Sequence, residues 1–342
     1  MQWTVAIGID THKDGHVAVA LDRFGAQVDS FKATASRSGY LALHEWALSL
    51  GEPVFALEGA GSYGAGLARF LQFCGCRVFE CERPRRAERR RGKNDLIDAA
   101  LAARRLLSGE RLACPRGLIG PREDLRLLLL ERRSAVRART ATLNQLQAVL
   151  VTAPERLRTR LGGLAGDQLA RAVTRLRRRS GEEAVLHGVL RRLGRRVGSF
   201  DAELAELEHE LEAIVSTLVP ELLAEAGVGA VCAAQLVVSS GDPARMASEA
   251  SFAALAGTSP VDASSGRHKR HRLNRGGDRQ LNRALHIISI SRVRWHPETA
   301  AYYQRLLASG KTSREARRCV KRMLARYFHR RLRSLPALAL TT

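Results

Sequence analysis

Four carboxylates stand where an apolar run ends or a helix begins, positions from which side chains can reach a shared site. Asp10 and Glu58 each follow a short apolar run, and Asp95 and Asp98 are three residues apart in the first turn of a predicted helix, so they share one face. Carboxylate oxygens suit a hard cation, so the four acids could surround a pair of Mg²⁺ ions, with Mn²⁺ as a substitute, for phosphodiester chemistry. Each acid also has a plainer explanation, because acids are common in loops after strands and Asp95 with Asp98 could only complement a helix dipole.

A serine pair is the second candidate for chemistry. Ser264 and Ser265 precede Gly266 and a run of cations, which comprises Arg267, His268, Lys269, Arg270, His271, Arg272 and Arg275. A serine here could attack a backbone phosphate, because the cations favour both the approach of DNA and the charge that develops at phosphorus. The same residues fit a loop that only grips DNA and contains serines by chance.

The turn Gly227-Val228-Gly229 is the third candidate site. A G-x-G turn between two helices can direct backbone N–H groups at a phosphate, as helix-hairpin-helix elements do. It can also be an ordinary connection between packed helices. If the turn and the loop both bind nucleic acid, the binding residues are Gly227, Gly229, Arg267, Lys269, Arg270, Arg272 and Arg275.

The elements that must position the acids alternate between strands and helices. Short apolar runs predict strands over 4–9, 16–21, 26–31, 53–57 and 77–80, and helical spacing predicts helices over 40–50, 66–73 and 95–107, the last capped by Asn94. This βββαβαβα order predicts an α/β layer fold with a mixed sheet over residues 1–110.

The rest of the chain is predicted to be mainly helical. We expect a helical region over 120–219, with a basic linker over 151–198 that is rich in Arg and Gly, and a C-terminal domain over 220–335. A heptad pattern predicts a coiled-coil segment, formed by Phe200, Leu204, Leu207, Leu211, Ile214 and Leu218. The heptads could pair within the chain, as a packed helical hairpin, or between protomers.

Net charge points to a polyanionic partner. The 342 residues carry a net charge of +22, yet residues 1–80 hold six basic and eight acidic side chains, so the remainder carries +24. Cations that neutralise phosphates release counterions, which makes nucleic acid the leading partner. The sequence has no apolar run long enough to cross a bilayer and begins without a signal-peptide pattern, so we expect a cytoplasmic protein associated with the nucleoid of a prokaryote.

Three motifs together resemble a known family. Ile7-Gly8-Ile9-Asp10, Leu57-Glu58-Gly59-Ala60-Gly61-Ser62-Tyr63 and Lys93-Asn94-Asp95-Leu96-Ile97-Asp98-Ala99 resemble, in order and spacing, the D-E-D-D motif of insertion-sequence transposases whose N-terminal domain is RuvC-like with an RNase H fold. The family usually has Thr where this chain has Ala60. The resemblance continues through Gly227-Val228-Gly229, Ala254-Leu255-Ala256-Gly257, Pro260, Ser265-Gly266, Asn274-Arg275-Gly276-Gly277 and Leu281-Asn282-Arg283-Ala284-Leu285.

The resemblance implies a recombinase with a composite site. The family carries a catalytic serine before a glycine in its C-terminal domain, and the matching position is Ser265, with Ser264 as the alternative. It further implies strand cleavage and exchange at element ends and target DNA, guidance by a structured RNA of the bridge type, and a homo-oligomer, either a dimer or a tetramer.

Two other functions fit the same residues. A metal-dependent, structure-specific nuclease of the RuvC or RNase H type would use the four acids and water, and Ser265 would have no role. A non-catalytic, basic nucleic-acid-binding protein would use the acids only to cap helices.

Overall fold

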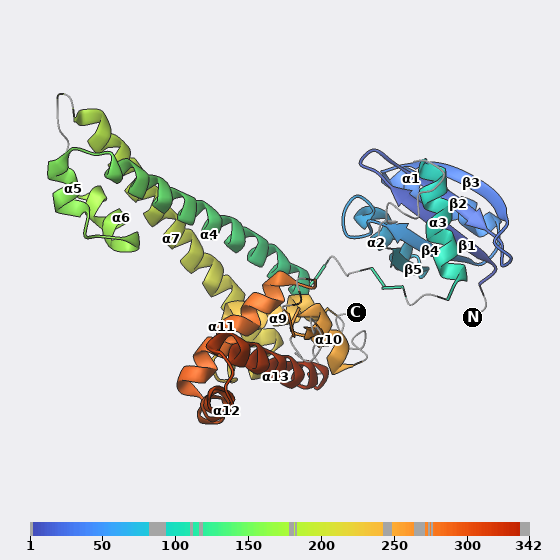
Figure 1. Ribbon diagram of the computed structural model, residues 1–342. Coiled ribbons are helices and arrows are strands. Elements are labelled where there is room, and N and C mark those ends of the chain that lie inside the picture. The colour runs from blue at the N-terminus through green and yellow to red at the C-terminus, as the bar shows by residue number, and fades with distance from the viewer. Residues whose placement is uncertain are drawn as a thin grey trace. The chain divides into compact units, whose positions relative to one another are not determined.

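The computed structural model divides into two compact units, residues Met1–Leu118 and Ile119–Thr342 (Figure 1). It describes residues 3–81, 94–109, 112–115, 119–177, 181, 183–241, 248–262, 271–272, 274 and 276–335. In the described part of the chain, no helix is both long and apolar enough to cross a bilayer.

The first unit is built on a five-stranded mixed sheet. Its strands are β1 (Val5–Thr11), β2 (Gly15–Leu21), β3 (Gln27–Thr34), β4 (Pro53–Glu58) and β5 (Arg77–Cys81). Their spatial order is β3-β2-β1-β4-β5, in which β2 is antiparallel to both neighbours and β4 is parallel to both. This arrangement confirms the predicted RNase H-like α/β fold.

Helices cover both faces of this sheet (Figure 1). Ile7 and Ile9 of β1 pack on one face with residues of α1 (Arg37–Ser49) and α2 (Ala65–Phe73). On the other face, Val19 and Leu21 of β2 pack against alanines of α3 (Asp95–Leu107). Side chains of β1 thus alternate between the two faces, as a period of two requires: Ile7 and Ile9 face α1 and α2, and Gly8 faces Ala99 of α3.

The second unit is largely helical, as predicted. It contains α4 (Pro121–Val151), α5 (Glu155–Leu161), α6 (Gly166–Thr174), α7 (Ala184–Leu218), α8 (Pro220–Leu223), α9 (Ala230–Ser240), α10 (Glu249–Leu255), a short hairpin of β6 (Val261–Asp262) and β7 (His271–Arg272), α11 (Arg279–Trp295), α12 (Pro297–Ala308) and α13 (Ser313–Arg333). Regions 120–219 and 220–335 share one hydrophobic core, because Leu125 of α4 and Leu211 of α7 join the cluster formed by the C-terminal helices.

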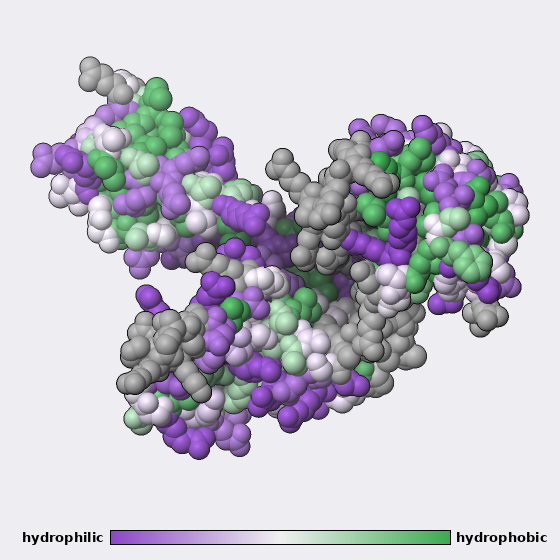
Figure 2. Space-filling model, turned by 45° about the vertical axis from the view of Figure 1, so that its right-hand side comes forward, coloured by the Kyte–Doolittle hydropathy of each residue, from purple (hydrophilic) through white to green (hydrophobic). Residues whose placement is uncertain are grey.

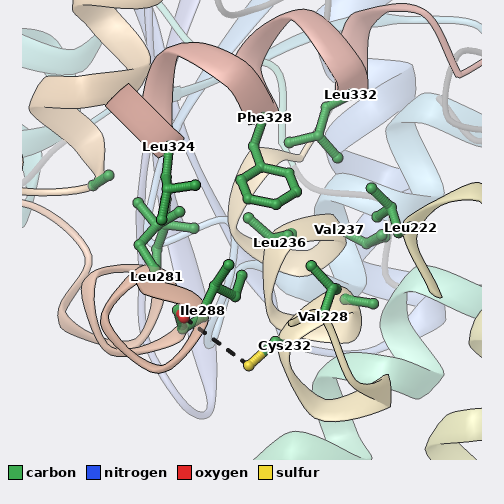
Figure 3. Close-up of a cluster of buried hydrophobic side chains, with 14 of the residues drawn as sticks. Leu222, Val228, Cys232, Leu236, Val237, Leu281, Ile288, Leu324, Phe328 and Leu332 are labelled. Atoms are coloured by element: carbon green, nitrogen blue, oxygen red, sulfur yellow. Dashed lines mark hydrogen bonds between the residues drawn. The ribbon is translucent and has the colours of Figure 1, made fainter. Parts of the chain in front are cut away.

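That core is assembled from helices far apart in the sequence. Leu236 of α9 lies near Phe328 and Leu324 of α13, with Leu281 and Ile288 of α11 on the adjoining side (Figure 3). Its one polar link in the close-up joins the Cys232 thiol to the carbonyl oxygen of Ala284, 4.0 Å away. Where Figure 2 colours the surface, hydrophilic side chains alternate with hydrophobic areas.

The heptad residues pack within the chain. Helices α4 and α7 run alongside each other (Figure 1), and the heptad residues Leu211, Ile214 and Leu218 pack in one cluster with Leu129 of α4. Arg132 of α4 also pairs with Glu208 of α7 at 2.6 Å. Of the two pairings that the heptads allow, the structure contains the helical hairpin.

The basic linker predicted over 151–198 is corrected by the structure. These residues include α5, α6 and the first turns of α7, and they enclose a separate hydrophobic cluster to which Leu157, Leu169 and Leu190 belong. The Arg and Gly content masked this arrangement, because arginines occupy the exposed faces of these helices while leucines at helical spacing fill the interior.

Candidate functional site

Strand register places Asp10 beside Glu58. The two residues are direct neighbours on the parallel strands β1 and β4, and neighbours in register point to the same face of a sheet. Asp10 lies within β1, which continues to Thr11, rather than just past the strand as the sequence predicts. Thr11 Oγ1 donates to the backbone oxygen of Glu58 at 2.6 Å, which ties the ends of the two strands together.

Helix α3 brings two further acids to this face. The side chain of Asn94 accepts a hydrogen bond from the Leu96 amide at 3.1 Å, which confirms the predicted N-cap and starts the helix so that Asp95 and Asp98 fall in its first turn. Gly8 of β1 allows the close packing, because a Cβ there would lie 1.9 Å from the backbone oxygen of Ala99. The glycine in the motif before Asp10 therefore has a packing role that directly serves the site.

A histidine that sequence analysis did not single out joins the acids. His12 Nε2 lies 3.2 Å from Asp10 Oδ2 and 3.5 Å from Asp95 Oδ1. One ligand atom from each of the three residues lies within 4.8 Å of the others, a spacing that could hold a metal ion. The sequence held one signal for His12, because side chains two residues apart along an extended chain point to the same face, and His12 comes two residues after Asp10.

Burial and neighbouring carboxylates raise the pKa of Asp10. Burial raises the pKa of Asp10 most, the carboxylates of Asp95 and Asp98 raise it further, and His12 opposes the change. Asp10 and Glu58 are each 7% exposed and Asp98 is 3% exposed. The carboxylates of Asp95 and Asp98 repel that of Asp10, and a divalent cation with oxygen ligands would relieve this repulsion, so the donor set fits Mg²⁺ or Mn²⁺.

A hollow of about 500 Å³ adjoins His12. Lys13 and Lys32 contribute cations to its wall, and Tyr63 contributes an aromatic ring that is 56% exposed. Cations and an exposed ring are the features that retain a nucleic-acid strand through its phosphates and bases. The acids thus lie next to a surface with the chemistry to hold a polynucleotide.

The second unit contains the other predicted residues. Ser264, Ser265, Arg267, Lys269, Arg270 and Arg275 lie outside the described residues. Arg272 is an exposed residue of β7 and lines a cavity of about 820 Å³. The structure therefore places one of the predicted loop cations at a cavity and leaves the serines as a prediction.

The glycine turn has a structural reason for one of its two glycines. Gly227 has a φ of 76°, and a Cβ there would lie 2.9 Å from the side chain of Ser291 on α11. Gly229 precedes α9 as its N-cap, and nothing lies within 4 Å of where its Cβ would be. Packing against Ser291 explains why residue 227 is a glycine, whereas the space around Gly229 at the start of α9 would also accept a side chain.

Comparisons with known proteins match both units. A transposase profile of the DEDD IS110 type matches residues 7–153, and a profile described as the transposase IS116/IS110/IS902 family matches residues 221–304. The chain is also similar to the "Insertion element IS110 uncharacterized 43.6 kDa protein" of Streptomyces coelicolor, with 37% identity over 114 residues. That alignment covers 32% of this chain and 28% of the relative.

Proposed function

We propose that the chain is a transposase of the IS110 family, whose profiles match residues 7–153 and 221–304, and that it cleaves and exchanges DNA strands at the ends of an insertion element and at its target. The observation that carries this proposal is the grouping of Asp10, Asp95 and His12, with Glu58 in register beside Asp10. Acids brought together from two strands and a helix suit metal-assisted phosphodiester chemistry.

The four acids have the role of metal ligands in this proposal. Asp10, Glu58, Asp95 and Asp98 would hold Mg²⁺ or Mn²⁺, and DEDD transposase domains imply a divalent metal. A bound divalent ion would lower the pKa of the attacking hydroxyl and stabilise the leaving oxygen. His12 would orient Asp10 and Asp95 through the contacts described above.

Ser265 is the proposed nucleophile, with Ser264 as the alternative. Its hydroxyl oxygen would form a bond to phosphorus and lose its proton, while the bond from phosphorus to one DNA oxygen breaks and that DNA end leaves as a hydroxyl. A hydroxyl of another strand could then attack the phosphoserine, which restores the serine and joins new ends. Serine is a weak nucleophile at neutral pH, so the acidic site is the expected source of its activation.

The finer features of the proposal concern partners. We propose that DNA is bound through the excess cations of residues 81–342, which carry +24, including Arg272 and the loop beside it. A structured guide RNA and a homo-oligomer, dimeric or tetrameric, follow from the family resemblance. An oligomer could combine the acids of one protomer with the serine of another.

Asp10→Asn tests the role of the acids. Purified protein with Mg²⁺, element-end DNA and co-purified RNA should exchange strands, and Asp10→Asn should abolish exchange while the circular dichroism spectrum stays unchanged. Glu45→Gln removes an exposed carboxylate of α1, away from the acids, and should exchange strands like the wild type. Wild-type exchange by Asp10→Asn would overturn the metal site.

Ser265→Ala tests the nucleophile in the same assay. It should eliminate both strand exchange and the covalent protein–DNA adduct, yet retain DNA binding, because only one hydroxyl is lost; Ser264→Ala should have a mild effect. The reverse pattern would move the assignment to Ser264. Full activity of both variants, with cleavage that still requires Asp10, would replace the serine mechanism by a nuclease that uses water.

A further inference from the structure

The cavity that Arg272 lines has no role in the function proposed above. It measures about 820 Å³ and lies among the segment after α10, the β6–β7 hairpin, α12 and α13. Among the described residues, its wall contains six Lys and Arg side chains but one carboxylate, Glu315. That carboxylate already accepts hydrogen bonds from the backbone and hydroxyl of Thr312 as part of a helix cap, so the cavity favours an anion.

Some of the wall cations are already paired with carboxylates. Arg326 and Arg322 of α13 lie 2.9 Å and 3.8 Å from Glu249 of α10. Arg318 lies 4.0 Å from Glu315. An anionic ligand must therefore be argued from the cations that lack such a partner, and the clearest of these is Lys321.

Lys321 is a buried ammonium that has no counter-ion in the described part of the chain. Its side chain is 8% exposed, and Nζ donates to Asn282 Oδ1 at 2.6 Å. Among the described residues no carboxylate lies within 4.0 Å of Nζ, and burial, followed by the charge of Arg318, lowers the pKa of Lys321. Burying an unpaired charge is costly, so an anion that enters the cavity and contacts Lys321 would recover part of that cost.

Asn282 holds this ammonium in a fixed position. Its amide nitrogen donates to the backbone oxygens of Ala256 at 2.7 Å and Gly257 at 3.3 Å, which directs Oδ1 to Lys321. An ammonium has three donors and Asn282 accepts one, so two remain for other acceptors in a cavity wall. This is a preorganised anion contact, because the ligand need not order the lysine when it binds.

The rest of the wall suits a flat, apolar body next to the anion. Tyr302 of α12 and both Cys319 and Met323 of α13 line the cavity and are half-buried. Aromatic rings and thioethers pack well against nucleobases, and Arg305 already lies over the Tyr302 ring at 5.9 Å. A negative group joined to a flat ring is the chemistry of a nucleotide.

We propose that this cavity binds one nucleotide of a nucleic-acid strand, with a backbone phosphate on Lys321 and the base against Tyr302. The base must be unstacked from its neighbours to enter, so the ligand is a single-stranded or everted nucleotide. Arg272 on the wall would contact an adjoining phosphate of the same strand. The proposal rests on the proposed function only in taking nucleic acid as the ligand, and its test requires no catalysis.

Cys319 provides a direct readout in the unmodified protein. A nucleotide in the cavity should shield this thiol, so a saturating single-stranded oligonucleotide should slow its alkylation by N-ethylmaleimide at least fivefold, measured by mass spectrometry. Cys74 is exposed in the first unit and serves as the internal control. An unchanged alkylation rate at Cys319 with bound oligonucleotide would overturn the proposal.

Three ligands separate the sources of the phosphate. DNA and RNA oligonucleotides of seven residues should both protect Cys319, whereas a mononucleotide or inorganic phosphate at the same phosphate concentration should not. Equal protection by a mononucleotide would overturn binding of a strand in favour of a free nucleotide. Protection by inorganic phosphate alone would overturn the contribution of the base.

Matched variants test the two contacts separately. Lys321→Met should weaken oligonucleotide binding about tenfold in fluorescence anisotropy, the effect expected for a charge-assisted hydrogen bond, while Arg314→Gln removes an exposed charge of the same helix and should cost at most about twofold. Tyr302→Ala should weaken binding and Tyr302→Phe should not, because the ring is retained. Equal losses from Lys321→Met and Arg314→Gln would overturn the phosphate contact. All of these outcomes are independent of strand exchange, so they do not depend on the acidic site or on Ser265.

Discussion

The packing of α3 on β1 makes Gly8→Ala an informative perturbation. A Cβ at residue 8 would lie 1.9 Å from the backbone oxygen of Ala99 and 2.3 Å from the backbone nitrogen of Ala103. Both atoms belong to the helix backbone, so rotation of a side chain cannot relieve the overlap. Non-bonded heavy atoms need roughly 3.5 Å, so α3 must move from the sheet by roughly 1.5 Å.

The expected loss follows from that overlap. Overpacking a core costs about 1–3 kcal/mol, and a clash with helix backbone belongs at the upper end, about 3 kcal/mol. In a unit of this size the loss corresponds to a melting temperature lowered by roughly 10 °C. Because the displaced helix carries Asp95 and Asp98 away from Asp10, the affinity for Mn²⁺ should fall by about tenfold or more.

Calorimetry of the full chain measures both quantities. Scanning calorimetry reports the melting temperature, and titration with Mn²⁺ reports the affinity of the acids. Gly198→Ala is the matched control, since Gly198 is an exposed residue of α7 with nothing within 4 Å of its missing Cβ, and alanine should stabilise that helix by about 0.5–1 kcal/mol. If Gly8→Ala melted with the wild type and bound Mn²⁺ equally well, the close contact of α3 with β1 would be refuted.

Three further outcomes are expected. Leu190→Ala should lower the free energy of unfolding by about 2–5 kcal/mol in denaturant titration, whereas Val185→Ala on the exposed side of α7 should change it by less than about 0.5 kcal/mol; equal small effects would restore the linker interpretation. Burial alone would raise the pKa of Glu225, but hydrogen bonds from Tyr327, Arg331 and Arg292 outweigh burial and lower this pKa. The stability that Glu225 contributes is therefore present above the ordinary glutamate pKa of about 4.3 and should be lost as the pH falls below it. Glu225→Gln should flatten this loss of stability in acid when melting is measured as a function of pH. Nucleic-acid affinity should fall steeply with salt in anisotropy titrations, and an affinity independent of salt would show that the excess positive charge is balanced within the protein.

Sequence reasoning worked where local chemistry determines the structure. Short apolar runs predicted all five strands of the first unit within a few residues of their ends, and the side chain of Asn94 predicted where α3 begins. Both signals are local, because apolar runs and helix capping involve neighbours in the chain. The position of Glu58 at the end of an apolar run followed from the same signal, whereas its parallel pairing with β1 came from the structure.

The features that sequence reasoning missed depend on contacts between distant residues. His12 became part of the site only because strand register and the first turn of α3 bring Asp95 to it. Lys321 would be expected on an exposed helix face, yet the packing of α13 on α11 buries it against Asn282. No periodicity in the sequence distinguishes such a lysine from an exposed one, because the distinction arises from the partner helix.

The two kinds of charge in this protein should respond differently to salt. The strands that carry Asp10 and Glu58 belong to residues 1–80, whose net charge is −2, while the +24 of the remaining residues is largely carried by arginines. At 0.1 M salt, interactions between exposed charges are largely screened beyond about 10 Å. Salt acts less on the carboxylates of Asp10 and Glu58, which are each 7% exposed. Nucleic acid should therefore dissociate at salt concentrations that leave the divalent ion bound, so a loss of activity in salt reflects lost DNA contacts, whereas a loss caused by replacing an acid persists at low salt.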